Sequence, residues 1–409
     1  MLKISANGRY IVNAAGKLFP YLADTAWTML QRLSREEIIE YLGIRSTQGF
    51  NAVQVSAVSE LDGLRRPNRE GELPFIDGDP AKPNEKYFAL VAFLLREAAR
   101  RGMVVTLLPT WGDKFNQKWG IGPEVFTPEN AFSYGCWLGT FAGHFDNLIW
   151  MLGGDRPIEN ERHRAIIDAM AEGLRRGEGT AGKKHLMTYH PCGEASSADF
   201  LKGCGYLDFH SVQSGHAFGG WNSHHFVERT LKADNKPCLD AECFYEDFPA
   251  DFCLDWGYRW TAADIRRRIY SNLVSGSLGH TYGHQSVWRF QEERDKEYPY
   301  RWKEALHRPM ALQVKHVNKL ISFIDLLSLR PGAVSANCLS AVGDDYLLIY
   351  PTRYRRVFVD VQQHFPCVQA QWYDTSCGII LESREDYRGK CVFTPPNPNG
   401  DYILLLWAK

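Results

Sequence analysis

The 409-residue sequence lacks a long hydrophobic run and lacks an apolar segment at its N-terminus. Its first residues, Met1-Leu2-Lys3-Ile4-Ser5, do not form the hydrophobic region of a secretory signal. No stretch approaches the ~18 consecutive apolar residues that a membrane-spanning helix needs. We therefore expect a cytoplasmic protein that does not insert into a membrane.

The sequence also lacks an excess of either charge, with 47 basic and 48 acidic residues. A protein that binds nucleic acid or an anionic membrane surface usually carries a basic excess. We therefore expect neither of them as a partner.

None of the ten cysteines belongs to a C-x-x-C pair, and several lie in apolar surroundings, for example Cys192, Cys238, Cys243 and Cys391. This pattern is typical of reduced, buried thiols rather than of disulfides or a structural zinc site.

What the chain does contain is a normal globular composition with many aromatic residues. The hydrophobic fraction is 44% and the charged fraction 23%, so a large core can form. Aromatic residues make up 13%, including 12 tryptophans. Tryptophan is common in cores, but it also suits clefts in which sugar rings pack against aromatic faces.

Eight short, mostly apolar runs alternate with helical patterns and are predicted to be β-strands. They cover residues 19–24, 50–58, 103–109, 147–152, 185–190, 207–213, 237–242 and 277–283. Eight alternations over about 310 residues predict an α/β fold, the (β/α)8 TIM barrel. A doubly wound open sheet is the alternative, but no G-x-G-x-x-G follows the first strand.

The two ends of the chain show a different pattern. Residues 1–18 resemble a short β-ribbon with turns at glycines, and we assign residues 1–330 to the barrel together with this ribbon. From residue 331 to 409 the helical period disappears. Extended runs at 346–350, 357–361, 368–373 and 402–407 predict a small C-terminal β-sandwich.

The fourth predicted strand leads into Gly153-Gly154-Asp155, followed by Pro157. The glycines stop the strand and allow backbone or ligand to approach closely. Barrel enzymes keep their chemistry at the carboxyl ends of the strands, so Asp155 is a candidate catalytic residue, although it could also cap a helix. The seventh strand places Glu242 in a similar setting.

Polar and aromatic residues occur at or just beyond the other strand ends. If they meet at one barrel mouth, they would form a pocket that hydrogen-bonds hydroxyl groups and packs against sugar rings. The candidates for substrate binding are Asp24, Trp27, Gln54, Trp111, Tyr189, His190, Gln213, His216, Tyr245, His280, Tyr282 and Trp288.

Asp155 and Glu242 would face each other across the mouth and could cleave a glycosidic bond. One would protonate the departing oxygen, and the other would attack the anomeric carbon or activate water. By analogy with other barrel glycosidases, strands four and seven favour retention of configuration. Glu246 is a rival to Glu242 but lies past the strand end. Asp240, two residues before Glu242, should point the same way but deeper into the barrel.

Two other interpretations stay open. The histidines 190, 210, 216, 280 and 284 could bind a metal in a hydrolase. Such barrels usually show His-x-His on the first strand, which here ends Leu22-Ala23-Asp24, so we expect no metal and no cofactor. A carbohydrate-binding barrel without turnover is the other interpretation.

Several motifs together resemble one known family, the apiosidase-like glycoside hydrolases of family 140. The motifs are Leu22 to Trp27, Trp150 to Pro157, Thr188 to Pro191, Gln213 to His216, Asp240 to Glu242 and Gly279 to Gly283. The C-terminal β-domain of that family is often labelled a collagen-binding domain of a collagenase, but no His-Glu-x-x-His protease motif occurs in this chain.

The resemblance implies a barrel with a β-sandwich and a retaining glycosidase in which Asp155 is the general acid/base and Glu242 the nucleophile. Family members that act on plant pectin are usually exported. Because this chain shows no signal, we expect a short oligosaccharide or glycoside as its substrate.

Overall fold

The computed structural model describes residues 1–336, 338–351 and 356–409, and all eight strands expected for the barrel are present. They belong to a sheet with the order β7-β6-β5-β4-β3-β11-β10-β9-β8. Its strands are β3 (Tyr21–Thr25), β4 (Ala52–Ser56), β5 (Val104–Leu108), β6 (Leu148–Gly153), β7 (Met187–His190), β8 (Ala195–Ser196), β9 (His210–Gln213), β10 (Cys238–Glu242) and β11 (Gly279–Tyr282). Only the short β8 runs antiparallel to its neighbour. The predicted TIM-barrel fold is confirmed.

The sheet curls so that β7 and β9 lie side by side, but among the described strands these two share no ladder. Single contacts close the seam instead. The backbone N–H of Asp208 donates to Met187 O at 2.8 Å, and the N–H of Met187 donates to Asp208 Oδ2 at 2.8 Å. Thr188 Oγ1 donates to the carbonyl of Phe209 at 2.9 Å. The barrel is therefore nearly closed, with one seam held by few bonds.

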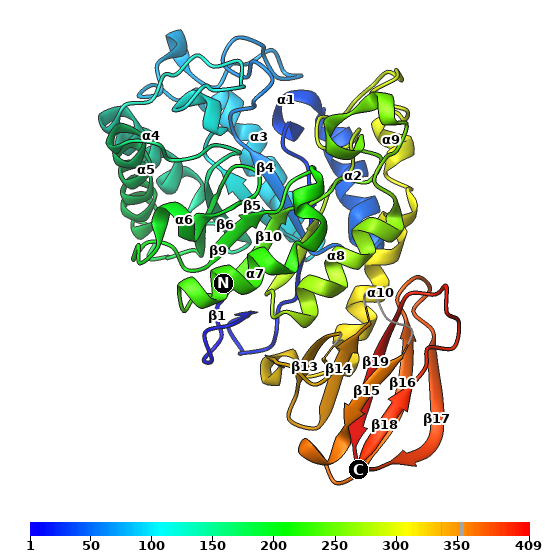
Figure 1. Cartoon of the computed structure of the whole chain (residues 1–409). Coiled ribbons are helices and arrows are strands. Elements are labelled where there is room, and N and C mark those ends of the chain that lie inside the picture. The colour runs from blue at the N-terminus through cyan, green and yellow to red at the C-terminus, as the bar shows by residue number, and fades with distance from the viewer. Residues whose placement is uncertain (337, 352–355) are drawn as a thin grey trace.

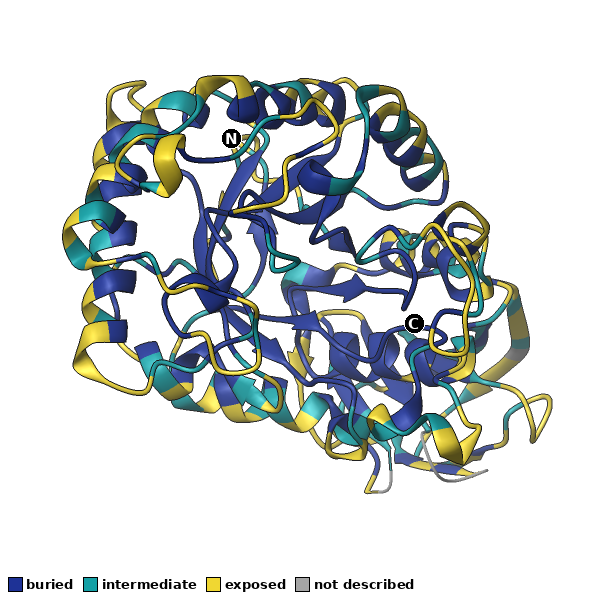
Figure 2. Ribbon diagram, turned by 90° about the horizontal axis from the view of Figure 1, so that it is seen from above, coloured by how far each residue is buried: buried dark blue, intermediate teal, exposed yellow. Residues whose placement is uncertain are grey.

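Helices surround the strands, buried on the side that faces the sheet and exposed on the outer side (Figure 2). The α-helices are α1 (Met29–Arg32), α2 (Arg35–Thr47), α3 (Glu85–Ala99), α4 (Pro128–Ala142), α5 (Glu161–Gly179), α6 (Ser197–Leu201), α7 (His224–Ala233), α8 (Ala262–Val274), α9 (Trp302–Ala305) and α10 (Pro309–Phe323). Short 3-10 turns are Ile76–Gly78, Gly112–Lys114, Phe218–Asn222, Ala250–Phe252, Leu254–Trp256, Leu326–Ser328 and Val361–Gln363.

Local sequence signals fix where several of these helices begin. Ser34 accepts the backbone N–H of Glu37, whose side chain accepts the N–H of Ser34, and this reciprocal pair is the capping box of α2. Thr261 and Asp264 form the same box at the start of α8. Pro128 occupies the first turn of α4, where its missing N–H costs nothing.

Helices α4 and α5 approach each other through glycines. A Cβ built on Gly139 would lie 2.5 Å from the carbonyl oxygen of Leu174, and one on Gly177 would lie 2.2 Å from that of Cys136. Because both obstacles are backbone atoms, no side chain fits at either position. The two helices can pack this closely only because these residues are glycine.

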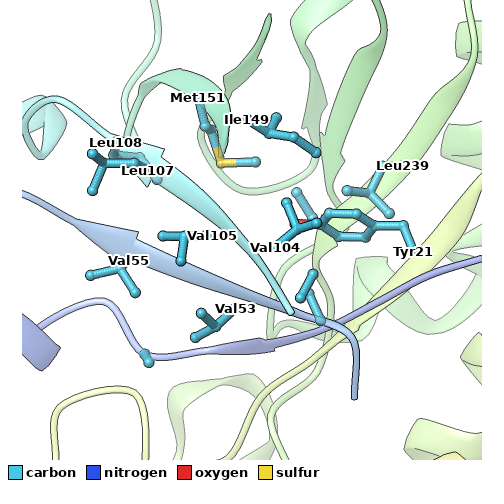
Figure 3. Packing of buried hydrophobic residues seen from close by; sticks show 14 of the residues in the cluster. Tyr21, Val53, Val55, Val104, Val105, Leu107, Leu108, Ile149, Met151 and Leu239 are labelled. Carbon is cyan, nitrogen blue, oxygen red and sulfur yellow. The ribbon is translucent and has the colours of Figure 1, made fainter. Parts of the chain in front are cut away.

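Apolar side chains of neighbouring strands pack closely around the sheet, as Figure 3 shows. The labelled ones are Tyr21, Val53, Val55, Val104, Val105, Leu107, Leu108, Ile149, Met151 and Leu239. Buried polar groups join strands of the barrel. Tyr21 Oη lies 2.7 Å from Thr106 Oγ1, and Gln54 Nε2 donates to Thr281 Oγ1 at 2.6 Å. These pairs satisfy polar atoms that no water reaches.

Beyond the barrel the chain forms antiparallel sheets. One sheet has the strand order β12-β13-β14-β19-β16-β17, and β15 pairs with β18 in a second one. Their bounds are β12 (Arg330–Pro331), β13 (Leu339–Val342), β14 (Tyr346–Tyr350), β15 (Val357–Asp360), β16 (Val368–Asp374), β17 (Ile380–Tyr387), β18 (Lys390–Phe393) and β19 (Tyr402–Ala408). The four predicted runs correspond to β14, β15, β16 and β19. The N-terminal ribbon also forms, from β1 (Lys3–Ile4) and β2 (Ile11–Val12).

The C-terminal strands, orange to red in Figure 1, lie against the barrel helices α8 and α10. Arg266 of α8 donates Nε to Asp401 Oδ2 at 2.9 Å, and the hydroxyl of Tyr350 donates to Asp401 Oδ1 at 2.7 Å. Lys319 of α10 donates to the carbonyl of Gly378 at 2.7 Å. The C-terminal part therefore packs on the outer helices, and none of its described residues lines the cavity described below.

All ten cysteines are free thiols. Within residues 1–336, 338–351 and 356–409, no helix combines the length and the apolar character needed to cross a membrane.

Candidate active site

A cavity of about 610 Å³ opens at the carboxyl ends of the barrel strands and contains both predicted catalytic carboxyls. It is lined by Trp27, Glu60, Trp111, Trp119, Asp155, Cys192, Gly193, Glu194, Gln213, Gly215, His216, Ala217, Glu242, Tyr245, Phe248, Phe252 and Trp288. The lining carries four acidic side chains and, among the residues that the structure describes, no lysine or arginine. Its walls are largely aromatic, as a site for a sugar ring requires.

Asp155 follows two glycines whose role lies in backbone packing. All three residues have positive φ, at 83° for Gly153, 115° for Gly154 and 54° for Asp155. A Cβ on Gly153 would lie 2.5 Å from the carbonyl oxygen of His190, and one on Gly154 would lie 2.8 Å from the backbone nitrogen of Gly112. The glycines therefore allow close approach of neighbouring backbone, and this sharp turn places Asp155 in the cavity wall.

The carboxyl group of Asp155 is fixed by two donors that reach the same oxygen. Trp119 Nε1 donates to Oδ2 at 2.7 Å, and Arg156 Nη1 donates to it at 3.0 Å. Oδ1 is left to face a molecule in the cavity. Burial, and after it the nearby charge of Glu242, raise the pKa of Asp155. This carboxyl therefore tends to keep a proton that it can give away.

Glu242 is held in the opposite charge state. His216 Nε2 lies 3.0 Å from its Oε1, and His190 Nε2 lies 3.1 Å from its Oε2. Burial alone would raise the pKa of Glu242, but the interactions with His190 and then His216 outweigh it and lower this pKa to about 2. Glu242 is therefore ionised at neutral pH.

A β-bulge separates Glu242 from Asp240 and corrects the expectation that both point the same way. In the pairing with β9, Asp240 is opposite Val212 and Glu242 is opposite the very next residue, Gln213. The extra residue turns the strand. Asp240 accepts from Asn272 Nδ2 of the outer helix α8 at 3.0 Å, so it faces the helix layer while Glu242 faces the cavity.

Glu246, the rival of Glu242, does not line the cavity. Its carboxyl accepts the hydroxyl of Tyr282 at 2.7 Å and the backbone N–H of Met310 at 3.3 Å. It is buried between β11 and α10 and has no access to a ligand.

His190 connects the two catalytic candidates from behind the cavity wall. Its Nδ1 lies 3.2 Å from the backbone nitrogen of Asp155, which donates its N–H. The same Nδ1 also lies 3.0 Å from the carbonyl oxygen of Pro191, and Nε2 faces Glu242 Oε2 at 3.1 Å. The ring is fully buried between Trp27 and Trp111, with centroids 5.2 Å and 5.9 Å away.

Six of the predicted binding residues line the cavity: Trp27, Trp111, Gln213, His216, Tyr245 and Trp288. They are also tied to one another. Trp27 Nε1 donates to the hydroxyl of Tyr245 at 2.7 Å, and the rings of His216 and Phe248 are stacked with centroids 4.3 Å apart. Such mutual contacts fix the rings before a ligand arrives.

Asp24 and Tyr282 lie outside the cavity. They are opposite each other on neighbouring strands and both face the helices. Asp24 accepts from Arg45 Nε at 2.6 Å and from the hydroxyl of Tyr41 at 2.5 Å, both of α2. Tyr282 donates to Glu246. Both side chains hold the barrel to its outer helices, so the structure gives neither of them access to a substrate.

Three further candidates also lie outside the cavity lining. The amide of Gln54 is bound to Thr281 and fully buried. The hydroxyl of Tyr189 donates to the carbonyl of Arg156 at 2.7 Å, and its ring contacts Phe200 of α6. His280 is buried beside Cys243. Their positions near strand ends were correctly predicted, but their side chains face the interior or the helices.

Loop residues complete the cavity and were absent from the predicted site. Glu60, Trp119, Cys192, Glu194, Phe248 and Phe252 all belong to segments between strands and helices. The length of the loop from 60 to 83 was the one sequence signal for such a role, because loops of that length are usually functional.

Glu60 places a third carboxyl group close to those of Asp155 and Glu242. Its Oε1 lies 3.9 Å from Nη2 of Arg156, the same guanidinium that binds Asp155 through Nη1. Burial, and after it the charge of Asp155, raise the pKa of Glu60 to about 7. Its charge therefore changes near neutral pH.

No group of three or more His, Cys, Asp or Glu side chains within the described part of the chain is arranged to hold a metal ion.

Known proteins share this architecture. A crystal structure of a glycoside hydrolase family 5 protein from Bacteroides vulgatus is 27% identical, with a TM-score of 0.89 over 100% of this chain and 93% of that one. A second structure, described as a glycoside hydrolase, is 26% identical with a TM-score of 0.88 over 100% and 97%. An α-amylase from Malbranchea cinnamomea, at 10% identity and a TM-score of 0.57 over 95% and 96%, shares the fold alone.

No curated protein matches the chain significantly. The family model described as "Apiosidase-like, catalytic domain" matches residues 5–328. This range includes the whole barrel, Asp155 and Glu242. The fold of the chain is that of the glycoside hydrolases, and the chain belongs to the apiosidase-like family.

Proposed function

We propose that the protein is a retaining glycosidase in which Asp155 is the general acid/base and Glu242 the nucleophile. One observation carries the proposal: two carboxyls share one cavity, and their surroundings push their pKa values in opposite directions. Such a pair is what acid-assisted glycoside cleavage needs, because one group must hold a proton and the other must be ionised.

In the first step, the proton on Asp155 passes to the glycosidic oxygen as the bond from this oxygen to the anomeric carbon breaks. A carboxylate oxygen of Glu242 bonds to the anomeric carbon and forms a glycosyl ester. Oδ2 of Asp155 is occupied by Trp119 and Arg156, so the transferred proton comes from Oδ1. The same two donors then stabilise the Asp155 anion.

In the second step, the Asp155 carboxylate takes a proton from water. The water oxygen attacks the anomeric carbon, and the ester bond to Glu242 breaks. Glu242 leaves as a carboxylate, stabilised by His190 and His216. Two inversions at one carbon leave the sugar with its original anomeric configuration.

The substrate that we propose is a short oligosaccharide or glycoside. A cavity of about 610 Å³ matches the usual size of small-ligand sites rather than an open groove along a polymer. Trp27, Trp111 and Trp288 supply faces for ring packing, and Gln213 and Glu194 supply polar groups for hydroxyls.

The test is a panel of aryl pentosides and hexosides, furanose forms included, with the anomeric product followed by NMR. Asp155→Asn and Glu242→Gln should each reduce kcat/KM on an accepted glycoside by about 10²–10⁴-fold. Asp255→Asn is the matched control, because that side chain is 88% exposed.

Near wild-type rates in both Asp155→Asn and Glu242→Gln would contradict the proposal. Sugar binding that survives these substitutions, without any turnover by the unaltered protein, would identify a binding barrel instead. Loss of activity with a chelator, together with stoichiometric zinc, would identify a metal hydrolase.

A further inference from the structure

Trp119 combines exposure with a direct bond to the proposed acid. Its side chain is 57% exposed, among the most exposed large apolar side chains described. Yet its ring lines the cavity, and its indole N–H donates to Asp155 Oδ2 at 2.7 Å. An exposed tryptophan that is tied to a catalytic group needs an explanation beyond packing.

Two cationic side chains, those of Arg156 and Lys118, hold the indole ring of Trp119 in place. The guanidinium of Arg156, itself fully buried, lies over the ring at 4.6 Å from the centroid. The ammonium group of Lys118 lies 5.6 Å from the same ring and pairs with Glu159 at 2.6 Å. The indole is therefore fixed in place while more than half of its surface stays open.

The segment that carries the ring is anchored as well. Asp113 is fully buried, and its Oδ2 accepts the backbone N–H of Gly122 at 2.8 Å and Lys114 Nζ at 2.7 Å. The position of Trp119 relative to Asp155 is thus set by buried charged groups below the loop rather than by the loop tip alone.

The bond to Asp155 determines which part of a substrate Trp119 can contact. The acid must reach the oxygen that leaves, so groups beside the acid lie beside the leaving group. An open indole face packs well against the CH face of a sugar ring. Within the described ranges, the other exposed aromatic side chains, such as Trp256 at 55%, have no hydrogen bond to Asp155 or Glu242.

Building on the glycosidase function proposed above, we propose that Trp119 forms a leaving-group subsite. It binds the sugar ring attached to the departing oxygen and makes the enzyme prefer a saccharide leaving group over a small one. The substrate is then at least a disaccharide, with the ring to be released packed on Trp119 and the other ring above Glu242.

The experiment compares two substrates with the same accepted sugar: its glycosyl fluoride, whose leaving group is too small to reach Trp119, and a disaccharide. In Trp119→Ala, kcat/KM for the disaccharide should fall about tenfold or more, because the lost ring raises KM and the lost N–H donor lowers kcat, while the fluoride value stays within about twofold. Trp119→Phe keeps a ring but loses the N–H donor. It should keep the disaccharide KM and lose part of kcat.

Trp256→Ala is the matched control, and both substrates should react with it as with the unaltered protein. A loss on the disaccharide that falls in kcat with KM unchanged would overturn the proposal and leave Trp119 as a support for Asp155. The fluoride does not separate the two roles, because fluoride leaves without a proton from Asp155. That outcome would leave the glycosidase function intact, because the function is judged separately from Asp155→Asn and Glu242→Gln.

Discussion

The imidazole Nε2 of His190 lies 3.1 Å from Oε2 of Glu242. The other ring nitrogen accepts the backbone N–H of Asp155. One buried ring thus contacts Asp155 through its backbone and Glu242 through its carboxylate. Since His190 cannot shift without disturbing both residues, the two carboxyl groups are held as one unit.

The pH dependence of activity should respond to His216. Burial raises the pKa of Glu242, and the two histidines lower it to about 2. Removing one donor in His216→Leu should therefore raise this pKa and move the acidic limb of kcat/KM upward by roughly 1–2 pH units. His216→Gln retains an N–H donor and should move it less. Profiles between pH 3 and 8 measure this, because a limb near pH 2 lies below that range in the unaltered protein and should enter it in His216→Leu. No fall in kcat/KM towards pH 3 in His216→Leu would refute the assignment.

Glu60 should influence the alkaline limb of the pH profile of kcat/KM. Because its pKa is raised to about 7, it becomes ionised as the pH rises through neutrality and places a negative charge beside Asp155. That charge helps Asp155 to keep its proton. In Glu60→Gln the charge is missing, so the alkaline limb of kcat/KM should move to lower pH. Asp255→Asn serves as the exposed control. A limb that moves to higher pH would show that this coupling has been misassigned.

Asp24 should matter for stability and not for substrate binding. Its carboxylate and the guanidinium of Arg45 are both fully buried, 2.6 Å apart. Asp24→Asn leaves the arginine charge without its partner, so we expect the free energy of unfolding to fall by about 3–5 kcal/mol. Asp344→Asn, in an exposed pair with Arg330, should cost less than about 1 kcal/mol.

Urea unfolding and KM, measured on the same Asp24→Asn protein, separate the two roles. We expect a lower unfolding midpoint with an unchanged KM in the folded enzyme. A raised KM with an unchanged midpoint would restore Asp24 as a substrate ligand.

The contact between α4 and α5 should not accommodate even one methyl group added at Gly139. A Cβ at Gly139 of α4 meets a backbone oxygen at 2.5 Å, whereas a Cβ at Gly179, the last residue of α5, meets nothing within 4 Å. Gly139→Ala should lower the free energy of unfolding by roughly 1–3 kcal/mol. Gly179→Ala should be neutral or stabilise by up to ~1 kcal/mol. Equal thermal midpoints for the two variants would show that the helices can move apart freely.

The barrel, and the meeting of Asp155 and Glu242 in one cavity, could be predicted because their signals are local. Short apolar runs marked the strands, and the carboxyl ends of parallel strands must gather at one face, which brought Asp155 and Glu242 into one cavity. The direction of each side chain was harder to predict. Asp24, His280 and Tyr282 lie near the edge of the barrel that holds the cavity, but their side chains face the helices. A strand that is apolar on both faces has no alternation of apolar and polar residues, so its sequence does not show which side chains point inward.

The remaining differences arise from features that no short motif encodes. The β-bulge beside Asp240 reverses the direction expected from simple alternation. Trp119 and Glu60 reach the cavity from loops, and their positions depend on Arg156, Asp113 and other partners distant in sequence. Residue types alone could not place them.

The lightly bonded seam between β7 and β9 bears on how the enzyme moves. The carboxyl end of β7 carries His190, and β9 leads directly to His216, so the two imidazoles that face Glu242 lie on opposite sides of this gap. Elsewhere around the barrel the strands are joined by ladders. Local opening of the barrel should therefore begin here, and amide hydrogen exchange should be faster for Thr188 and Ser211 than for the central residues of β4 and β5. Each such opening would separate the two imidazoles and, for its duration, remove their contacts with the Glu242 carboxylate.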